Sequence, residues 1–419
     1  MVPSGWKIQS PTSLFKLFSG FAFKSTDAQD SGTKWLKIAN VGIGEIKWDA
    51  DSFLPEHFLL EHKKFALTKG DIVVALTRPT LGNKLKVARL TKESDSSLLN
   101  QRVAKIVCKD DSDSEFVFQL LRSDEFAYRI NVGLLGTDPP NLSAKVLEDF
   151  TVGCPPLPEQ RKIAKILSTW DKAIATTEKL IATSKQQKKA LMQQLLTGKK
   201  RLVDPETGKA FEGDWEEVKL GDVCSKVTDG AHHSPKSVEY GYPMFSVKDM
   251  RATSFSENTA RHISEEDYQA LVKQNCKPEL NDILIAKDGS ILKYCFVVKE
   301  EVEGVILSSI ALLRPKLNVI SPNFIAQYFS QESVRFFVGK ALTSGSGVPR
   351  IILKDFKGIH LRIPSLLEQQ KIASVLTASD KDIEVLEAKL AHFKQEKKAL
   401  MQQLLTGKRR VKVADMEVA

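Results

Sequence analysis

The stretch KKALMQQLLTGKKRL, residues 188–202, returns almost unchanged as KKALMQQLLTGKRRV at residues 397–411, an offset of 209 residues. The same offset places Trp6 opposite Trp215, so the duplication extends far beyond the repeated motif. Because a period this long is too long for a stacked solenoid, each copy should be a complete domain. The sequence therefore predicts two divergent copies of one unit, each followed by an element that joins it to its twin.

The joining element of each copy is predicted to be one long helix. Residues 159–197 and 368–406 contain no proline or glycine, and each run stops at a glycine, Gly198 or Gly407. Glycine at this position is typical of a helix C-cap. At about 1.5 Å per residue, each helix would be a rod roughly 58 Å long.

Apolar residues recur along both predicted helices at heptad spacing. Two such stripes can bury each other, and antiparallel packing would give a pseudo-two-fold axis with the globular domains at opposite ends. The alternative, in which each helix lies on a larger core, stays open. The predicted coiled-coil seam consists of Ile163, Leu167, Trp170, Ile174, Ile181, Leu191, Leu195, Ile372, Leu376, Ile383, Leu386, Leu390, Phe393, Leu400 and Leu404. Polar residues interrupt it at Thr177, Ser184, Lys188, Ser379 and Lys397.

The charge of the chain is concentrated in the repeated segments. Of a net +9, residues 151–212 contribute 12 basic and 6 acidic groups and residues 359–419 contribute 11 and 8, whereas the two globular stretches are nearly neutral. Cations that follow helix ends suit the helix dipole, so this excess does not by itself indicate nucleic-acid binding. The five cysteines form no CxxC pair, and no apolar run approaches a membrane span. We expect a cytoplasmic protein with reduced thiols.

The globular stretches, residues 1–150 and 213–358, share one order of predicted elements. In the first, strand-like segments KWLKIANVG, DIVVALTRPTLG, KLKVARL and QRVAKIVC precede a helix, EFVFQLLRSDEFAYRI. In the second, PMFSVKDM, DILIAKDGSI, YCFVV and VILSSIALLRP precede a helix, PNFIAQYFSQESVRFF. This order predicts an α+β fold for each domain. The strands agree between the copies while the loops differ, which is typical of one scaffold that recognises two different targets.

A small-residue loop, a DF dipeptide and PPLPEQRKIAKIL leading into a long helix resemble the specificity subunits of type I restriction-modification enzymes. The resemblance covers essentially the whole chain, although the second copy has IPSLLEQQ in place of PPLPEQR. It implies two target-recognition domains alternating with two helical spacers that pair as an antiparallel coiled coil. The implied divisions are domain 1 (1–154), central helical repeat (155–200), linker (201–212), domain 2 (213–363), distal helical repeat (364–408) and tail (409–419).

The resemblance also implies a function. Each recognition domain would read one half of a bipartite, asymmetric site in double-stranded DNA, and the coiled coil would set the spacing between the halves. The helical repeats would dock two adenine methyltransferase subunits and, through them, restriction subunits. The chain itself would be non-catalytic and bind no cofactor, since S-adenosylmethionine is expected on the methyltransferase. No membrane partner is expected.

Base readout requires donors and acceptors on loops that reach a groove of DNA. The candidate DNA-binding residues are Lys34, Lys37, Asn40, Arg78, Thr80, Asn83 and Lys84 in the first domain, and His232, His233, Lys236, Lys248, Arg251, Lys287, Asp288, Ser290, Ser344, Ser346 and Arg350 in the second. The two histidines are adjacent, so in an extended chain they point to opposite sides. We therefore expect no metal site there.

Two alternatives to DNA recognition are a methyltransferase and a protein-binding scaffold. The motif DPPN at residues 138–141 is similar to the Pro-Pro motif of amino-methyltransferases, but Asn141 stands where an aromatic residue would stack on a flipped base. No glycine-rich cofactor loop precedes it, so we interpret DPPN as a turn and expect no catalytic site. The remaining alternative is a coiled-coil scaffold whose twin domains bind proteins rather than DNA.

Overall fold

The computed structural model describes residues 3–49, 52–136, 138–344 and 347–413. Helices and strands are mixed in both globular domains, which confirms the predicted α+β class. The chain divides into two compact units. Unit 1 comprises Met1–Glu178 and Lys389–Ala419, and unit 2 comprises Lys179–Ala388.

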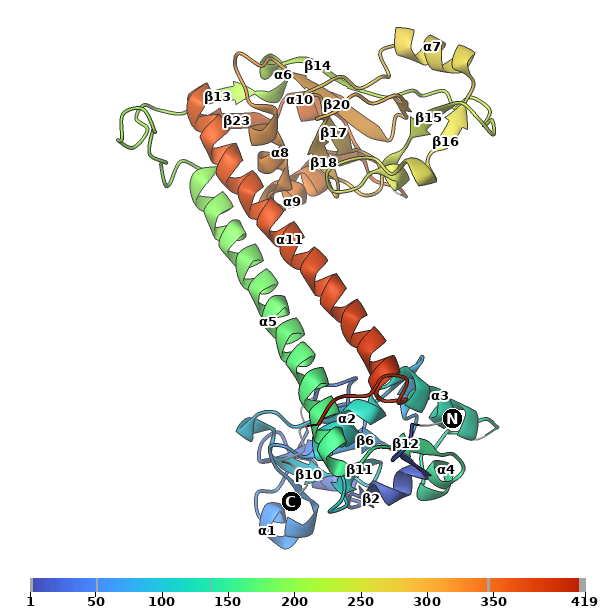
Figure 1. Ribbon diagram of the computed structural model, residues 1–419. Helices are drawn as coiled ribbons and strands as arrows, with labels where there is room; N and C mark the ends of the chain where they lie inside the picture. The colour runs from blue at the N-terminus through green and yellow to red at the C-terminus, as the bar shows by residue number, and fades with distance from the viewer. Residues whose placement is uncertain (1–2, 50–51, 137, 345–346, 414–419) are drawn as a thin grey trace. The chain divides into compact units, whose positions relative to one another are not determined.

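Each unit contains one globular domain and part of both long helices. These helices are α5 (Leu157–Leu195) and α11 (Leu366–Leu404), drawn in green and red in Figure 1. Both are continuous, as predicted, and each begins and ends two residues earlier than the predicted run. The helices start directly after a proline-containing turn, where the first N–H groups need no partner within the helix.

The domain of unit 1 is built around a four-stranded antiparallel sheet in the order β2-β11-β6-β9. A second sheet has the order β4-β3-β10-β5, in which β3 and β10 run parallel. The strands are β1 (Lys7–Gln9), β2 (Phe15–Ser19), β3 (Thr33–Leu36), β4 (Phe53–Leu54), β5 (Ala66–Leu67), β6 (Ile72–Ala75), β7 (Thr80–Leu81), β8 (Lys84–Leu85), β9 (Val87–Arg89), β10 (Ser97–Leu99), β11 (Val103–Cys108) and β12 (Val152–Cys154). The short helices include α1 (Phe58–Glu61) and α4 (Ala144–Glu148).

The domain of unit 2 repeats this plan. Its main sheet has the order β14-β20-β17-β18, the counterpart of the main sheet of unit 1, and a smaller sheet has the order β16-β15-β19. The strands are β13 (Glu216–Lys219), β14 (Cys224–Asp229), β15 (Tyr242–Phe245), β16 (Arg261–Ile263), β17 (Ile283–Ala286), β18 (Cys295–Val297), β19 (Val305–Ile306), β20 (Ile310–Pro315), β21 (Thr343–Ser344), β22 (Arg350–Ile351) and β23 (His360–Ile363). The helices include α6 (Leu220–Val223), α7 (Glu265–Lys273) and α10 (Leu353–Lys357).

Three of the predicted elements are each divided in two. The helix predicted over EFVFQLLRSDEFAYRI is two helices, α2 (Ser114–Leu121) and α3 (Asp124–Gly133), because Ser123 is extended and its hydroxyl caps α3 by accepting the N–H of Phe126. A break at the equivalent place separates α8 (Pro322–Ser330) from α9 (Glu332–Ala341), where Gln331 is extended but its side chain makes no cap hydrogen bond. The segment VILSSIALLRP is likewise not one strand, because β19 and β20 belong to different sheets.

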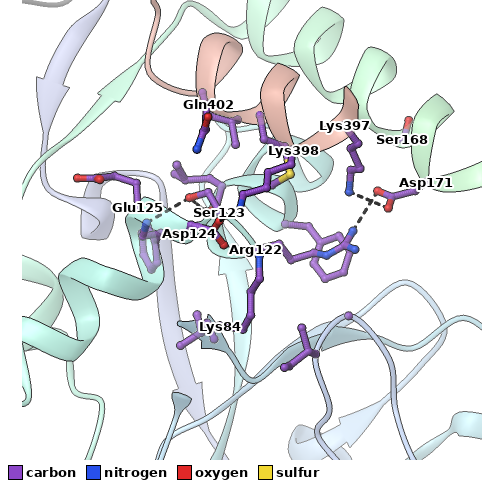
Figure 2. A pocket seen from close by; sticks show the side chains of 18 of the residues that line it. Lys84, Arg122, Ser123, Asp124, Glu125, Ser168, Asp171, Lys397, Lys398 and Gln402 are labelled. Atoms are coloured by element: carbon purple, nitrogen blue, oxygen red, sulfur yellow. Dashed lines mark hydrogen bonds and ion pairs between the residues drawn. The ribbon is translucent and has the colours of Figure 1, made fainter. Parts of the chain in front are cut away.

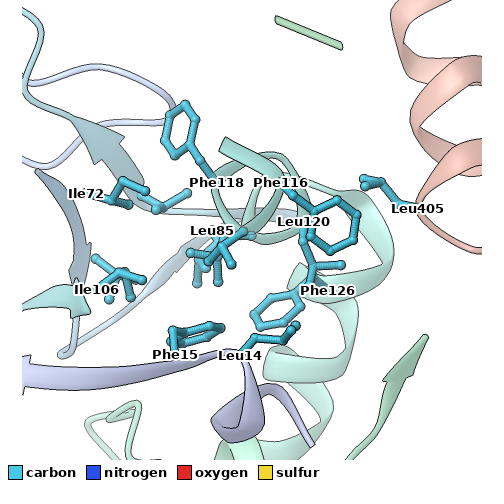
Figure 3. Close-up of a cluster of buried hydrophobic side chains, with 14 of the residues drawn as sticks. Leu14, Phe15, Ile72, Leu85, Ile106, Phe116, Phe118, Leu120, Phe126 and Leu405 are labelled. Atoms are coloured by element: carbon cyan, nitrogen blue, oxygen red, sulfur yellow. The ribbon is translucent and has the colours of Figure 1, made fainter. Parts of the chain in front are cut away.

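The ends of the long helices complete the domain cores. In unit 1, Ile163 and Leu167 of α5 join the hydrophobic cluster that also holds Phe116, Phe126 and Leu405, the last of which approaches from the end of α11 (Figure 3). In unit 2, Leu195, Ile372 and Leu376 occupy the corresponding cluster. Every residue of the predicted seam is buried or half-buried. The stripe therefore serves two purposes, since its end positions face a domain core and its inner positions face the partner helix.

The repeated sequence forms the same set of ion pairs twice, once in each unit. In unit 1 the pairs are Glu159–Arg410 (2.8 Å), Asp171–Lys397 (2.7 Å) and Glu178–Lys394 (2.7 Å). In unit 2 they are Glu368–Arg201 (2.7 Å), Asp380–Lys188 (2.5 Å) and Glu387–Lys185 (2.6 Å). In both units the partner position on α11 falls as the position on α5 rises, so the helices run antiparallel.

The Glu-Gln dipeptide at the start of each helix anchors the helix to its domain. In unit 1, Gln160 donates to the carbonyl of Pro155 at 3.0 Å and accepts the N–H of Asp113 at 2.9 Å. In unit 2, Gln369 donates to Pro364 at 2.9 Å and accepts the N–H of Ser321 at 2.9 Å. Both glutamines are buried. A buried amide that satisfies two backbone groups fixes the direction in which the helix leaves the domain.

The glycine after each helix is required by its conformation and by its neighbours. Gly198 and Gly407 have φ of +72° and +74°, in the left-handed region that favours glycine. A Cβ on Gly198 would lie 3.2 Å from the Trp215 ring, and one on Gly407 would lie 2.5 Å from Pro3. The glycines that the sequence indicates as C-caps therefore also make room for the start of each domain.

Asp171→Asn is expected to lower the free energy of unfolding by about 1–3 kcal/mol, because the Asp171 carboxylate accepts from Lys397 at 2.7 Å and Arg122 at 3.0 Å. The counterpart Asp380→Asn should cost about 1 kcal/mol or less, since Asp380 is 48% exposed and pairs with one cation, Lys188. Chemical denaturation of both variants beside the wild type measures the difference. Equal losses would contradict this account.

The same carboxylate predicts the direction of a pH effect. Burial alone would raise the pKa of Asp171, but the charges of Arg122 and Lys397 outweigh it and hold that pKa below its usual range. A lowered pKa contributes stability that is present above the unfolded value of about 3.9 and is lost as the pH falls toward the folded value. The stability of Asp171→Asn should therefore depend less on pH in acid than that of the wild type.

Candidate nucleic-acid interface

In unit 1, the loop that follows β6 crosses the segment that precedes α4. The N–H of Arg78 donates to the carbonyl of Pro140 at 2.8 Å, and the N–H of Leu142 donates to Leu76 at 2.8 Å. Thr77 thereby forms an antiparallel bridge with Asn141, and its hydroxyl donates to the Asn141 Oδ1 at 3.3 Å. The DPPN motif thus contributes one side of a short antiparallel pairing between two loops, which we call a crossing.

In unit 2, an equivalent crossing joins the loop after β17 to the segment before α10. The N–H of Gly289 donates to the carbonyl of Pro349 at 2.8 Å, and the N–H of Ile351 donates to Lys287 at 3.1 Å. Asp288 and Arg350 form the antiparallel bridge. The two crossings match residue for residue, so that Thr77 corresponds to Asp288 and Asn141 corresponds to Arg350.

The left-handed position of the loop differs between the two crossings. It is occupied by Gly289 (φ +70°) in unit 2 but by Arg78 (φ +49°) in unit 1. An ordinary residue in this region costs about 1–2 kcal/mol of backbone strain, and such strain is concentrated at functional sites. Arg78 is exposed, so its side chain is a candidate surface contact.

A chain of charges supports the crossing in unit 2. The Asp229 carboxylate contacts His232 and Lys287, both at 3.1 Å, and the Lys287 ammonium lies 3.3 Å from Asp288. Asp288 in turn lies 3.7 Å from Nε of Arg350. The inner members of this chain are nearly buried, with 9–14% of the side chain exposed, whereas Arg350 is 65% exposed. The arrangement brings together four predicted residues, which are His232, Lys287, Asp288 and Arg350.

The predicted residues on and just after β3 of unit 1 are engaged within the domain. The Lys34 ammonium donates to the Ser94 carbonyl, and that of Lys37 donates to Ser52 at 2.7 Å and lies 3.8 Å from the Trp35 ring. Burial lowers the pKa of Lys37. Asn40 is buried, and its amide accepts from one backbone group and donates to another. A buried amide with both ends used holds a turn, so Asn40 is not available for base contact.

The β7–β8 hairpin carries three further predicted residues. Thr80 donates to Asn131 of α3 at 2.6 Å, Asn83 is exposed at the tip, and the Lys84 ammonium pairs with Asp124. Burial would raise the pKa of Asp124, but the bond from Lys84 outweighs it and lowers that pKa. The Asn131 amide also donates to the Gly82 carbonyl at 3.2 Å, so three side-chain contacts fix the hairpin to α3.

The remaining predicted residues of unit 2 lie on several separate loops. His233, Lys236 and Lys248 are exposed, and Arg251 donates to the carbonyls of Lys248 and Met250, both at 2.9 Å. Ser290 lies in the Gly289 turn, and Ser344 is paired with Arg350 across β21 and β22. Ser346 falls outside the described residues.

A groove of about 1490 Å³ lies in unit 1, lined mainly by α3, α5 and α11 (Figure 2). Its charged groups are paired with one another. Asp124 contacts Lys398 at 3.5 Å, and Asp171 contacts Arg122 and Lys397. Because its cations are largely neutralised, the groove is a weaker candidate for phosphate binding than the crossings.

Thr77 and the base-reading potential of Asn141 were missed by sequence reasoning. Asn141 is 64 positions from Thr77, and only the backbone crossing brings them together. The internal repeat carried the signal. Its 209-residue offset places DPPN opposite GVPR at residues 347–350, and the strands that precede Thr77 and Asp288 match at a similar offset of 211 residues.

The described residues contain neither a membrane-spanning helix nor a metal-binding cluster. No helix in the described ranges is long and apolar enough to cross a membrane. Among the residues with described positions, no three His, Cys, Asp or Glu side chains form a group suited to a metal ion.

A duplicated α+β domain with unlike surface loops, joined by paired antiparallel helices, defines a two-domain recognition protein. The chain matches the family described as type I restriction modification DNA specificity domain over residues 3–185 and 212–395. Since these matches cover most of the chain, it belongs to the specificity subunits of type I restriction-modification systems.

Individual relatives show how far the similarity extends. The specificity subunit of the type I restriction enzyme MjaVIII from Methanocaldococcus jannaschii is 36% identical over 202 residues, so the match spans about half of each chain, 48%. The EcoBI specificity subunit from Escherichia coli is 25% identical over 395 residues, 88% of this chain and 78% of that one. The crystal structure of the S subunit from M. genitalium has a TM-score of 0.60 and 17% identity over 96% of each chain, which shows a shared fold.

Proposed function

We propose that the chain is the non-catalytic DNA-recognition subunit of its system and that each domain reads one half of a bipartite, asymmetric site. The observation that carries this proposal is the pair of equivalent crossings with unlike side chains. One scaffold presents Thr77 and Asn141 in the first domain and Asp288 and Arg350 in the second. Equivalent scaffolds with different donors and acceptors are suited to reading different base pairs.

The helix pair sets the spacing between the half-sites and docks two methyltransferase subunits in this proposal. Support comes from an equivalent surface that is present on each unit. Lys189 pairs with Glu332 in unit 2, as Lys398 pairs with Asp124 in unit 1. Equivalent surfaces suit two copies of one partner. The partner would carry S-adenosylmethionine and methylate adenine, and restriction subunits would join through it.

Exposed aromatic residues support the docking proposal. Tyr128 of α3 and Phe336 of α9 hold equivalent positions and are 59% and 68% exposed. Large exposed aromatic side chains are enriched in protein interfaces, where they supply much of the binding energy. A methyltransferase contact at these two positions would use an aromatic side chain in each unit.

Binding to duplex DNA across a salt series tests the recognition proposal. The affinity should fall steeply as salt rises, because cations that contact phosphates displace condensed counterions. A scaffold whose domains bind proteins would show no measurable affinity for DNA at any salt concentration, and that result would reject the proposal.

Arg78→Gly separates a DNA contact from a structural role. Glycine relieves the strain at φ +49°, so the stability should change by less than about 1 kcal/mol. Affinity for duplex DNA should nevertheless fall about 5- to 20-fold at low salt, and the salt slope should decrease by about one. The control Lys185→Ala removes one charge from the helix pair. If Arg78→Gly behaves like that control, Arg78 is not a DNA contact.

A further inference from the structure

The two crossings present side chains with different base preferences at the same position. Arg350 and Asn141 are equivalent, and both are exposed. Arginine pairs in bidentate fashion with guanine O6 and N7, whereas asparagine pairs in the same way with adenine N6 and N7. The identity of this one residue therefore predicts a different base in each half-site.

The guanidinium of Arg350 lies beside a carboxylate. Asp288 lies 3.7 Å from its Nε, and the Asp288 carboxylate is itself held by Lys287 at 3.3 Å. The Asp288 carboxylate is nearest to Nε, and 65% of the Arg350 side chain is exposed, so the guanidinium is accessible to a ligand. A planar fork with two parallel N–H donors is the geometry that guanine recognition needs.

Asn141 is held in a similar manner by a different partner. The Thr77 hydroxyl donates to its Oδ1 at 3.3 Å, which uses one of the two acceptor sites on that oxygen. The second acceptor site on Oδ1 and the amide N–H groups remain for a ligand. These are the acceptor and donor that adenine N6 and N7 require.

We propose that Arg350 specifies a guanine in the half-site read by the second domain and that Asn141 specifies an adenine in the half-site read by the first. Asp288 and Thr77 act as positioning residues that orient these side chains. This assignment rests on the proposed DNA-recognition function and adds the residue and base class that set each half-site.

In the test, the full chain is co-expressed with its cognate methyltransferase. The modified adenines of the host DNA are then sequenced. Arg350→Ala should turn one fixed G·C position of one half-site into a degenerate position, and Asn141→Ala should do the same at one fixed A·T position of the other half-site. Each variant serves as the control for the half-site that it leaves unchanged. Arg362→Ala, an exposed arginine on β23 of the same domain as Arg350, should leave every position fixed.

Binding of the purified complex to the methylated site and to single-base variants gives the magnitude. Wild type should prefer the cognate base at each position by about 10- to 100-fold, and Ala variants should lose most of that preference. Asp288→Asn should weaken the guanine preference while the adenine preference in the other half-site remains. Arg350→Lys should retain overall affinity but lose selectivity, because a point charge cannot replace the bidentate fork.

Several outcomes would overturn the assignment. If Arg350→Ala lowers affinity for all sequences equally and decreases the salt slope by about one, Arg350 is a phosphate contact. If both Arg350→Ala and Arg350→Lys abolish methylation everywhere, the residue is structural rather than base-specifying. If the wild type methylates no bipartite sequence, the proposed function itself fails, whereas a bipartite wild-type site that the variants leave unaltered rejects only this assignment.

Discussion

Replacing residues 213–358 with the corresponding domain of another specificity subunit is expected to change one half of the methylated sequence and leave the other half unaltered. The main sheets of the two units have the same strand order, and each domain joins the helices through its own core cluster. A donor domain should therefore fit if it preserves the contacts of Gln327 with Asp380 and of Glu332 with Lys189.

The expected effect is large. Affinity of the chimaera for the original site should fall toward the non-specific level, a loss on the order of 10³-fold or more, because several base pairs are mismatched together. Modified-adenine sequencing of cells that hold the chimaera and the methyltransferase gives the result. Loss of both halves, or retention of both, would contradict the view that each domain reads separately.

Leu167→Ala is expected to lower the free energy of unfolding by about 2–5 kcal/mol, and Leu376→Ala should cost a similar amount. The two leucines are equivalent in the repeat, and both are fully buried where a long helix enters a domain core. Truncation leaves a cavity that the packed helix and sheet cannot close. The loss in the free energy of unfolding should therefore be similar in the two units, because the two leucines occupy equivalent positions of the repeat.

Differential scanning calorimetry of the two variants checks this prediction, with Leu180→Ala as the matched control. Leu180 lies on α5 but is 50% exposed, so its truncation should cost about 0.5 kcal/mol or less. Each core variant should mainly lower the transition of its own unit. If Leu167→Ala or Leu376→Ala lowers the free energy of unfolding by as little as Leu180→Ala does, the helix end does not complete the core.

The helices and their pairing could be predicted because heptad spacing is a local property of the sequence. The break at Ser123 was missed because the apolar pattern continues across it, while a single hydroxyl at the end of α2 caps a new helix. The pair Asp171–Lys397 joins residues 226 positions apart, so no local pattern indicates it. The offset of the internal repeat shows only that Lys397 and Lys188 occupy equivalent positions.

The candidate interface was predictable only in part. Loop donors such as Arg78 and Arg350 stand out by residue type, but Asn40, which was also selected by residue type, is buried. Exposure depends on tertiary packing, which composition does not encode. The role proposed for Asn141 depends on its bridge to Thr77, which joins two loops that are distant in the sequence.

Sequencing of modified adenines in cells that co-express the chain with its methyltransferase tests the central claim most directly. Two equivalent scaffolds with unlike loops predict one bipartite sequence, with two different halves at a fixed separation. A continuous sequence, two identical halves or a separation that varies from site to site would contradict that claim.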